Sequence, residues 1–414
     1  MSEYIDNHTK RKEALKSVIQ QLHEGKTVDE VKEEFAAVLQ NVGATEISQV
    51  EQALIDEGLP ETEVKRLCDV HVAVFRESLE EQSKPDTVPG HPVYTFLAEN
   101  GATARVLDAL EKALDTLKTT PTDERLAAAR ERLAELRKYE KHYLRKENIL
   151  FPYLEKHGFT GPSAVMWAIH DDVRAGWKEL EGLLAAGPGD DQTTFASRID
   201  EVFGPLNTAI REMFYKEEHI LFPTSLEKLS EGEWAEIRGQ EDEIGFSYVE
   251  PGRQWTPGAA VAKSVAQPTA APAQSGDLLH LDTGTLTPLE VNRILTHLPI
   301  DVTYVDKDDT VRFFSQGKER IFPRSPAIIG RKVQKCHPPA SLNRVQQILD
   351  DFRAGERDEA EFWIQMRGRF LHIRYFAIRD ERGEYQGTVE VSQDVTDIRS
   401  LEGERRLADE SEKE

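Results

Sequence analysis

A short phrase occurs twice in this chain of 414 residues, and it constrains the fold more than any other feature. Residues 142–152 read HYLRKENILFP and residues 213–223 read MFYKEEHILFP, so the copies lie 71 residues apart and both end in Ile-Leu-Phe-Pro. A repeat at this spacing within helical sequence predicts a duplicated helical hairpin. Two such hairpins form an up-and-down four-helix bundle with approximate twofold symmetry, in which polar residues of matching helices face one another across the core.

The remaining helices of the predicted bundle fall within residues 90–250. The first begins near His91, the second ends at Pro152, the third spans MWAIHDDVRAGWKELEGLL and the fourth ends near Leu221. Their connections, TTPTD, GFTGPS and GPGDDQ, are short and contain the turn-forming residues Gly and Pro. Short connections of this kind are typical of antiparallel neighbours in a bundle.

The segments on either side of the bundle predict different structures. Residues 1–83 show four helical patterns, one of which opens with Thr27 and Glu30 in the spacing of a capping box. Residues 251–285 include AAVAKSVAQPTAAPAQSG, which is small, Ala/Pro-rich and typical of a flexible linker with extended stretches. The sequence therefore predicts a helical module, a bundle and a linker, in that order.

Residues 286–400 predict a mixed α+β module, and residues 401–414 a charged tail. IDVTYVDKDDTVRFFS reads as two alternating strands around a turn, and LNRVQQILDDFRAG reads as a helix. Three further strands follow, separated by turns at Arg367-Gly368 and Arg382-Gly383. The aromatic side chains of these strands are interpreted as core and edge packing. The predicted fold class is thus a multidomain chain, all-α first and α+β last.

Composition excludes several classes of protein. The formal net charge of −23 disfavours binding to nucleic acid or to an anionic membrane, since like charges repel. We find no apolar run long enough for a membrane span and no signal-peptide pattern. Cys68 and Cys336 are the only cysteines, which excludes a disulfide framework. These features predict a cytoplasmic protein.

The three modules resemble known families. LHEGKTVDEVKEEF, EISQVEQALIDEGLP and LCDVHVAVF resemble the DUF438 family, and the repeated ILFP phrase resembles hemerythrin-like HHE cation-binding domains. GRKVQKCHPPASLNRV, IRYFAIRDERGEYQG and TVEVSQDVTDI are similar to PAS sensor domains. The order of helical module, HHE bundle and PAS domain is the usual order in DUF438 proteins.

The HHE resemblance implies a cation site in the bundle, with His ten residues and Glu six residues before the ILFP proline. The first copy has His142 but Lys146, and the second has Met213 but Glu217, so each copy keeps one expected ligand. Adding the other helices, the predicted metal ligands are His91, His142, His170 and Glu217, with Glu147, Glu218 and Tyr94 as further candidates. Glu147 and Glu218 point inward only if the helix contains a local bulge. The implied cofactor is non-haem iron, mononuclear or dinuclear.

Two other interpretations of the bundle stay open at this stage. A purely structural bundle could pair Lys146 with Glu217 or Glu218, because a protonated lysine cannot bind a metal. Alternatively His142 and Met213, at matching positions, could provide the axial His/Met pair of a haem. The pair Cys68 and His71, and the pair Cys336 and His337, are interpreted by default as structural. His71 would become a ligand if the first module docked on the bundle near His91, and a haem or redox role for Cys336 or His337 stays open.

The predicted function is a sensory or regulatory protein that binds a metal in its bundle and a small ligand or partner through PAS. The sequence contains no Gly-rich phosphate loop and no G-x-S-x-G elbow, so it favours a sensor over an enzyme. Output would pass through an unidentified protein partner, and a homodimer is expected by analogy with other PAS domains. The alternatives are a non-haem iron enzyme that handles nitric oxide or peroxide or repairs iron centres, and a carrier of haem or iron.

Overall fold

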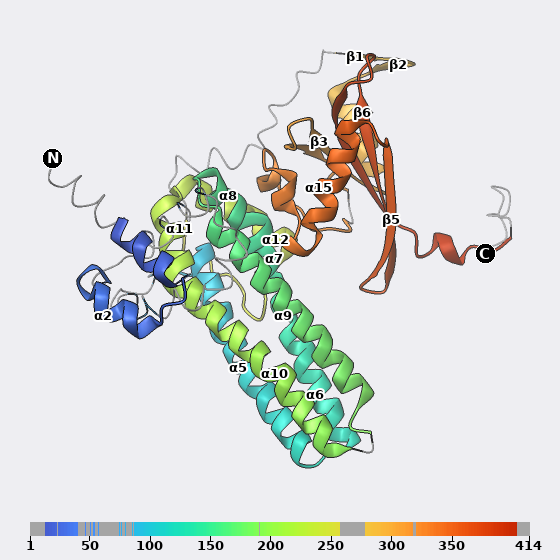
Figure 1. Cartoon of the computed structure of the whole chain (residues 1–414). Helices are drawn as coiled ribbons and strands as arrows, with labels where there is room; N and C mark the ends of the chain where they lie inside the picture. The colour runs from blue at the N-terminus through green and yellow to red at the C-terminus, as the bar shows by residue number, and fades with distance from the viewer. Residues whose placement is uncertain are drawn as a thin grey trace, which may run out of the picture. The chain divides into compact units, whose positions relative to one another are not determined.

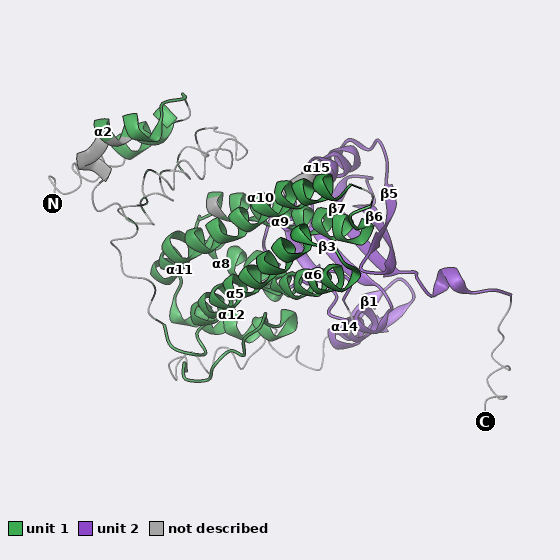
Figure 2. Cartoon of the chain, turned by 90° about the horizontal axis from the view of Figure 1, so that it is seen from below, with its two compact units in different colours: residues 1–268, 325–327 green, residues 269–324, 328–414 purple. Residues whose placement is uncertain are grey.

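The computed structural model describes residues 13–22, 24–39, 87–189, 191–256, 278–317 and 320–403, with single positions between 46 and 85. It divides into two compact units, which are coloured separately in Figure 2. The first unit is Met1–Pro268 with Ser325–Ala327, and the second is Thr269–Arg324 with Ile328–Glu414.

The first unit contains the predicted bundle of long helices (Figure 1). Its helical elements are α5 (Pro92–Thr119), α6 (Asp123–Leu136), η1 (Arg137–Tyr139), α7 (Glu140–Arg145), η2 (Lys146–Leu150), α8 (Phe151–Lys156), α9 (Gly161–Ala186), α10 (Gln192–Lys216), η3 (Glu217–Leu221) and α11 (Phe222–Lys228). Buried Leu, Phe, Tyr and Trp side chains from all four long helical segments form one continuous apolar core. Burial of this surface holds the helices together.

The two copies of the repeated phrase each contain a π-helical turn, η2 and η3, and these begin 71 residues apart. Both π-helices end immediately before a Phe-Pro pair, and the chain then continues as α8 and α11. The predicted helix ends at Pro152 and near Leu221 are therefore wrong. The wider turn tolerates a proline, which has no N–H to donate, so the helix passes through it instead of stopping.

A further helix, α12 (Glu231–Ile244), was not predicted as a separate element. Ser230 caps its N-terminus in a capping box with Glu233, and Gly245 follows its last turn with a φ of 82°. Trp234 and Ile237 anchor it in the core of the bundle. The four-helix bundle is thus closed at one end by a fifth helix.

The N-terminal segment is helical at residues 13–22 and in α2 (Val28–Leu39). The predicted capping box is confirmed: Thr27 N–H donates to Glu30 Oε2 at 2.8 Å, and Glu30 N–H donates to Thr27 Oγ1 at 3.3 Å. A small apolar cluster around Leu15 and Val31 also includes Ile220 of the bundle. Most of the other two predicted helices, together with Cys68 and His71, lie outside the described residues.

The second unit is built on a five-stranded antiparallel sheet in the order β4-β3-β7-β6-β5. The strands are β3 (Asp301–Asp306), β4 (Val311–Phe314), β5 (Glu359–Met366), β6 (Arg369–Arg379) and β7 (Tyr385–Asp394), with α14 (Pro288–His297) before them and α15 (Pro339–Ala354) between β4 and β5. The predicted strands, turns and helix are confirmed. Short 3-10 turns lie at η4 (Pro326–Ile328), η5 (Val333–Cys336) and η6 (Ile398–Ser400).

One difference concerns the predicted linker. A two-stranded hairpin, β1 (Leu279–Leu281) and β2 (Gly284–Leu286), occupies its last part and begins before the predicted boundary at residue 286. Part of the charged tail, residues 404–414, lies outside the described residues. No helix among the described residues is long and apolar enough to cross a membrane.

Candidate functional site

The core of the bundle contains a cluster of polar side chains that are each at most 2% exposed. Burying charged groups costs free energy unless each is paired, so every contact in this cluster matters for stability. We call it the polar centre. Its members are Glu99 and Asn100 of α5, Tyr139 of η1, His142 and Arg145 of α7, Lys146 and Glu147 of η2, His170 of α9, Glu217 of η3 and Glu241 of α12.

His142 lies between two carboxylates. Its Nδ1 is 2.8 Å from Glu99 Oε2, and its Nε2 is 3.2 Å from Glu217 Oε2. The ring stacks on Tyr139 with centroids 4.4 Å apart. Both ring nitrogens of His142 therefore have a carboxylate oxygen at hydrogen-bond distance.

Lys146 lies at the middle of the polar centre. Its ammonium contacts Glu217 Oε1 and lies 2.9 Å from His170 Nε2, with the Tyr143 ring centroid 4.9 Å away. His170 Nδ1 is 2.7 Å from Glu147 Oε1, so the ring donates to that carboxylate and accepts from the ammonium. Burial and then the neighbouring charge of Lys146 hold the pKa of His170 well below its usual range, which keeps the imidazole neutral.

Glu217 is the acid that connects these groups. Besides Lys146 and His142 it accepts a hydrogen bond from Asn100 Nδ2 at 2.8 Å, and Tyr139 Oη donates to Asn100 Oδ1 at 2.6 Å. Burial alone would raise the pKa of this carboxyl, but Lys146 and His142 outweigh it and hold the pKa at about 2. Glu217 is therefore ionised at neutral pH.

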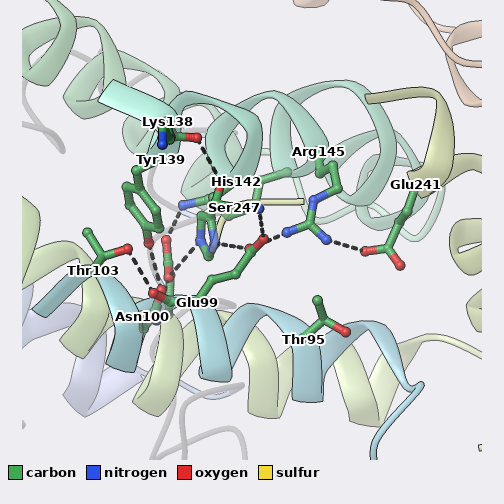
Figure 3. Close-up of polar contacts among 12 residues, drawn as sticks. Thr95, Glu99, Asn100, Thr103, Lys138, Tyr139, His142, Arg145, Glu241 and Ser247 are labelled. Carbon is green, nitrogen blue, oxygen red and sulfur yellow. Dashed lines mark hydrogen bonds and ion pairs between the residues drawn. The ribbon is translucent and has the colours of Figure 1, made fainter. Parts of the chain in front are cut away.

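Arg145 forms a second group of ion pairs beside His142 (Figure 3). Its guanidinium contacts Glu99 Oε2 and donates to Glu241 Oε1 at 2.9 Å, and Ser247 N–H donates to Glu99 Oε1 at 2.6 Å. Burial raises the pKa of Glu241 to about 7, despite the opposing effect of Arg145. Sequence reasoning missed these residues, although Arg145 three positions after His142 on the same helix was a usable signal.

A second guanidinium closes the polar centre on the side of α9. Arg174 donates to Glu147 Oε2 at 2.9 Å, and also contacts Glu140 and Asp171. Burial raises the pKa of Glu147 to about 7, with Arg174 opposing the shift. Glu147 points inward because η2 widens the helix at this position, which is the local bulge that the sequence analysis required.

Of the residues predicted as ligands, the structure brings together His142, His170, Glu217 and Glu147. His91 instead caps α5, where its Nδ1 accepts from Val93 N–H at 3.1 Å and its ring packs against Trp234 and Trp255. The two remaining candidate ligands, Tyr94 and Glu218, are only partly covered, and Tyr94 is 37% exposed. Met213 is buried in the apolar core.

The donors of the polar centre do not fit a metal ion. Metal binding requires neutral imidazole and ionised carboxylate groups with free lone pairs. Here both nitrogens of His142 face carboxylates, and the one accepting nitrogen of His170 is taken by Lys146. Within the part of the chain that the structure describes, no three His, Cys, Asp or Glu side chains converge on a common point as metal ligands would.

The same contacts weigh against the haem interpretation. An axial histidine needs one nitrogen free for iron, whereas both nitrogens of His142 have carboxylate partners at hydrogen-bond distance. Met213 belongs to the same apolar core as Phe96 and Tyr139, and that core is continuous. The interior around this pair is occupied by packed side chains.

Comparisons with known proteins agree with these modules. The description "Family of unknown function (DUF438)" matches residues 15–81, "Hemerythrin HHE cation binding domain" matches 91–225, and "PAS domain" matches 291–396. The chain thus contains, in this order, segments that match the models of DUF438, of the hemerythrin HHE domain and of the PAS domain.

Several solved structures are similar to parts of the chain. A C-terminal domain from Streptococcus mutans is 34% identical and spans 30% of this chain and 98% of its own, with a TM-score of 0.29. A PAS domain from Colwellia psychrerythraea is 13% identical and covers 26% of this chain and 97% of its own, with a TM-score of 0.22. The PAS domain from Bordetella pertussis BvgS is 19% identical and covers 27% of this chain and 90% of its own, with a TM-score of 0.23. The comparison with curated proteins found no match. An HHE domain joined to a PAS domain indicates a sensory or regulatory protein.

Proposed function

We propose that this protein is a sensor that takes a small polar ligand on the inner face of its PAS sheet and passes the signal to a protein partner. The observation that carries this proposal is a buried carboxylate, Glu390, in the middle of the central strand β7. A buried acid on a sheet surface needs partners, and surplus hydrogen-bonding groups around it can serve a ligand.

The sheet register puts Glu390 in a row of polar residues. Thr303 of β3 and Tyr375 of β6 are its direct cross-strand neighbours, and Ser392 lies two positions further along β7 on the same face. Ser392 Oγ donates to Glu390 Oε1 at 3.2 Å, and Arg324 Nη2 lies 3.4 Å from Glu390 Oε2. Both contacts are long, so neither fully satisfies the carboxylate.

His337 provides the second feature of this face. Its Nε2 is buried without a hydrogen-bond partner, and Glu390 and Arg324 are the charged groups that act on it. Burial lowers the pKa of His337 to about 4, so the ring is neutral at physiological pH and has one donor and one acceptor nitrogen. A small molecule with both donors and acceptors would satisfy this nitrogen and the acid together.

The test uses the full chain. Native mass spectrometry identifies small molecules that purify with the protein, and thermal-shift titration with amino acids and short-chain carboxylic and hydroxy acids covers the expected chemistry. We expect a bound molecule whose retention is lost in Glu390→Gln and kept in the control Glu361→Gln, where the exposed acid of β5 is changed. If no molecule binds, or if both variants bind it equally, the proposal fails.

Metal-dependent functions gain less support from the bundle. An iron sensor, an enzyme that handles nitric oxide or peroxide, and a haem or iron carrier all need an open coordination position. Since the donors of the polar centre are engaged with one another, the proposed function uses no metal step.

The partner is proposed to be another protein, and the chain itself to form a homodimer. The face of the sheet opposite Glu390 is partly apolar, and it includes Trp363 of the edge strand β5, which is 61% exposed. Exposed aromatic groups on an edge strand are typical of association surfaces. Analytical ultracentrifugation of the full chain tests the dimer.

A further inference from the structure

The two halves of the bundle contribute opposite charges at matching positions. Lys146 begins η2 and Glu217 begins η3, and each stands six residues before the proline of its own copy of the repeated phrase. The structure joins these two side chains in a buried ion pair. The pairing of Lys146 with Glu217 that the sequence left open as a structural alternative is therefore confirmed.

We infer that the ammonium group of Lys146 is the bound cation of this bundle and that it occupies the position between His170 and Glu217 that a metal ion would otherwise take. The group touches one imidazole nitrogen and one carboxylate oxygen, which are the donor types that bind iron, manganese or zinc. These two donors come from different helices, as the ligands of a metal in a bundle do.

The charges around Lys146 agree with this assignment. Four buried carboxylates, Glu99, Glu147, Glu217 and Glu241, face the cations of Arg145, Lys146 and Arg174. A divalent ion added to this set would lie against the ammonium, which repels it. Removing the ammonium leaves His170 Nε2 and Glu217 Oε1 without their partner and open to another cation.

The assignment predicts that one substitution converts the bundle into a metal site. Lys146→Glu places a carboxylate six residues before Pro152, matching Glu217 in the second copy, and leaves His170 free to bind. Lys146→His offers a neutral donor at the same place and adds no negative charge. Lys141→Met, which removes an exposed lysine of α7, is the matched control.

The experiment is equilibrium dialysis of each full-length, chelator-treated protein against Co²⁺, followed by elemental analysis and visible absorption of the bound ion. We expect no Co²⁺ above the buffer level in the wild-type protein and in Lys141→Met, and about one ion per chain in Lys146→Glu or Lys146→His. Changing His170 to Ala in the metal-binding variant should release the ion, which locates the site.

Stoichiometric Co²⁺ in the wild-type protein overturns the inference, because the donors are then available despite the ammonium. The inference is also overturned if neither Lys146 variant binds Co²⁺ although circular dichroism shows that at least one of them is folded. Metal-dependent folding of a variant that is unfolded without Co²⁺ supports it. The PAS experiment above depends on Glu390, so its outcome does not affect this one.

Discussion

Arg145 should contribute more to the stability of the bundle than any exposed arginine, and Arg145→Met tests this. Its guanidinium is fully buried, contacts Glu99 and Glu241, and lies over the rings of Phe96 and Phe246 at 4.5 and 4.7 Å. Methionine keeps much of the apolar volume but leaves two buried acids without their cation. Removing one partner of a buried pair costs about 3–5 kcal/mol.

A cost of that size is measurable in a domain the size of this bundle. For domains of 150–250 residues, 1 kcal/mol corresponds to about 2–4 °C in Tm, so Arg145→Met should lower Tm by about 6–20 °C. Four of the five tryptophans, at positions 167, 177, 234 and 255, lie in the first unit, so their fluorescence in urea or on heating reports on the bundle. Arg132→Met on the exposed side of α6 is the control, with an expected change within about 0.5 kcal/mol.

The stability lost in Arg145→Met should also depend on pH. The pKa of Glu241 is already raised to about 7 by burial, and Arg145 opposes that rise, so its removal raises the pKa further. A carboxyl with a raised pKa binds its proton more tightly when folded, so it favours the folded state at low pH and disfavours it as pH increases. Arg145→Met should therefore be less damaging at pH 5 than at pH 8. A loss equal to that of Arg132→Met, or one that grows toward acid pH, would refute the reasoning.

Three further predictions concern other parts of the chain. His91→Ala should lower bundle stability by about 1 kcal/mol through loss of the helix cap, and it should leave the cation binding of the Lys146 variants unchanged in the dialysis assay; release of the ion would make His91 a ligand after all. Gly387→Ala should destabilise the PAS unit by about 1–3 kcal/mol in thermal unfolding, because φ is 152° and the added methyl group would meet the carbonyl oxygen of Val305; Gly317→Ala, where φ is not positive and the nearest atom is the carbonyl oxygen of Thr296 at 3.7 Å, controls for the substitution itself. Trp363→Glu should shift a homodimer toward monomer in ultracentrifugation, while Glu361→Gln should not, and an unchanged distribution would exclude this face of β5 from the interface.

The sequence predicted the elements whose signals are local. Strands β3 to β7 follow from alternation and from turns such as Arg367-Gly368, and the bundle follows from the repeated phrase. The ends at Pro152 and Leu221 were wrong because a π-helical turn precedes the proline in each copy and lets the helix continue through it. Helix α12 was missed because its exposed face is highly charged and only a few residues, among them Trp234 and Ile237, anchor it.

The candidate site was predictable in part for a similar reason. Helical spacing and the family resemblance identified His142, His170 and Glu217, which do meet in the core. The roles of Glu99 and Glu241 depend on which helices are neighbours, and this is a tertiary property. His91 was placed with the ligands by its position at the start of a helix, but that same position makes it a cap.

The opposite charges at positions 146 and 217 also limit what the duplicated hairpin can do by itself. Two copies of the first half would bring ammonium against ammonium in a dry interior, and two copies of the second would bring carboxylate against carboxylate. Each half is therefore poorly suited to assemble with its own twin. The ion pair thus commits the repeated segments to remain together in one polypeptide.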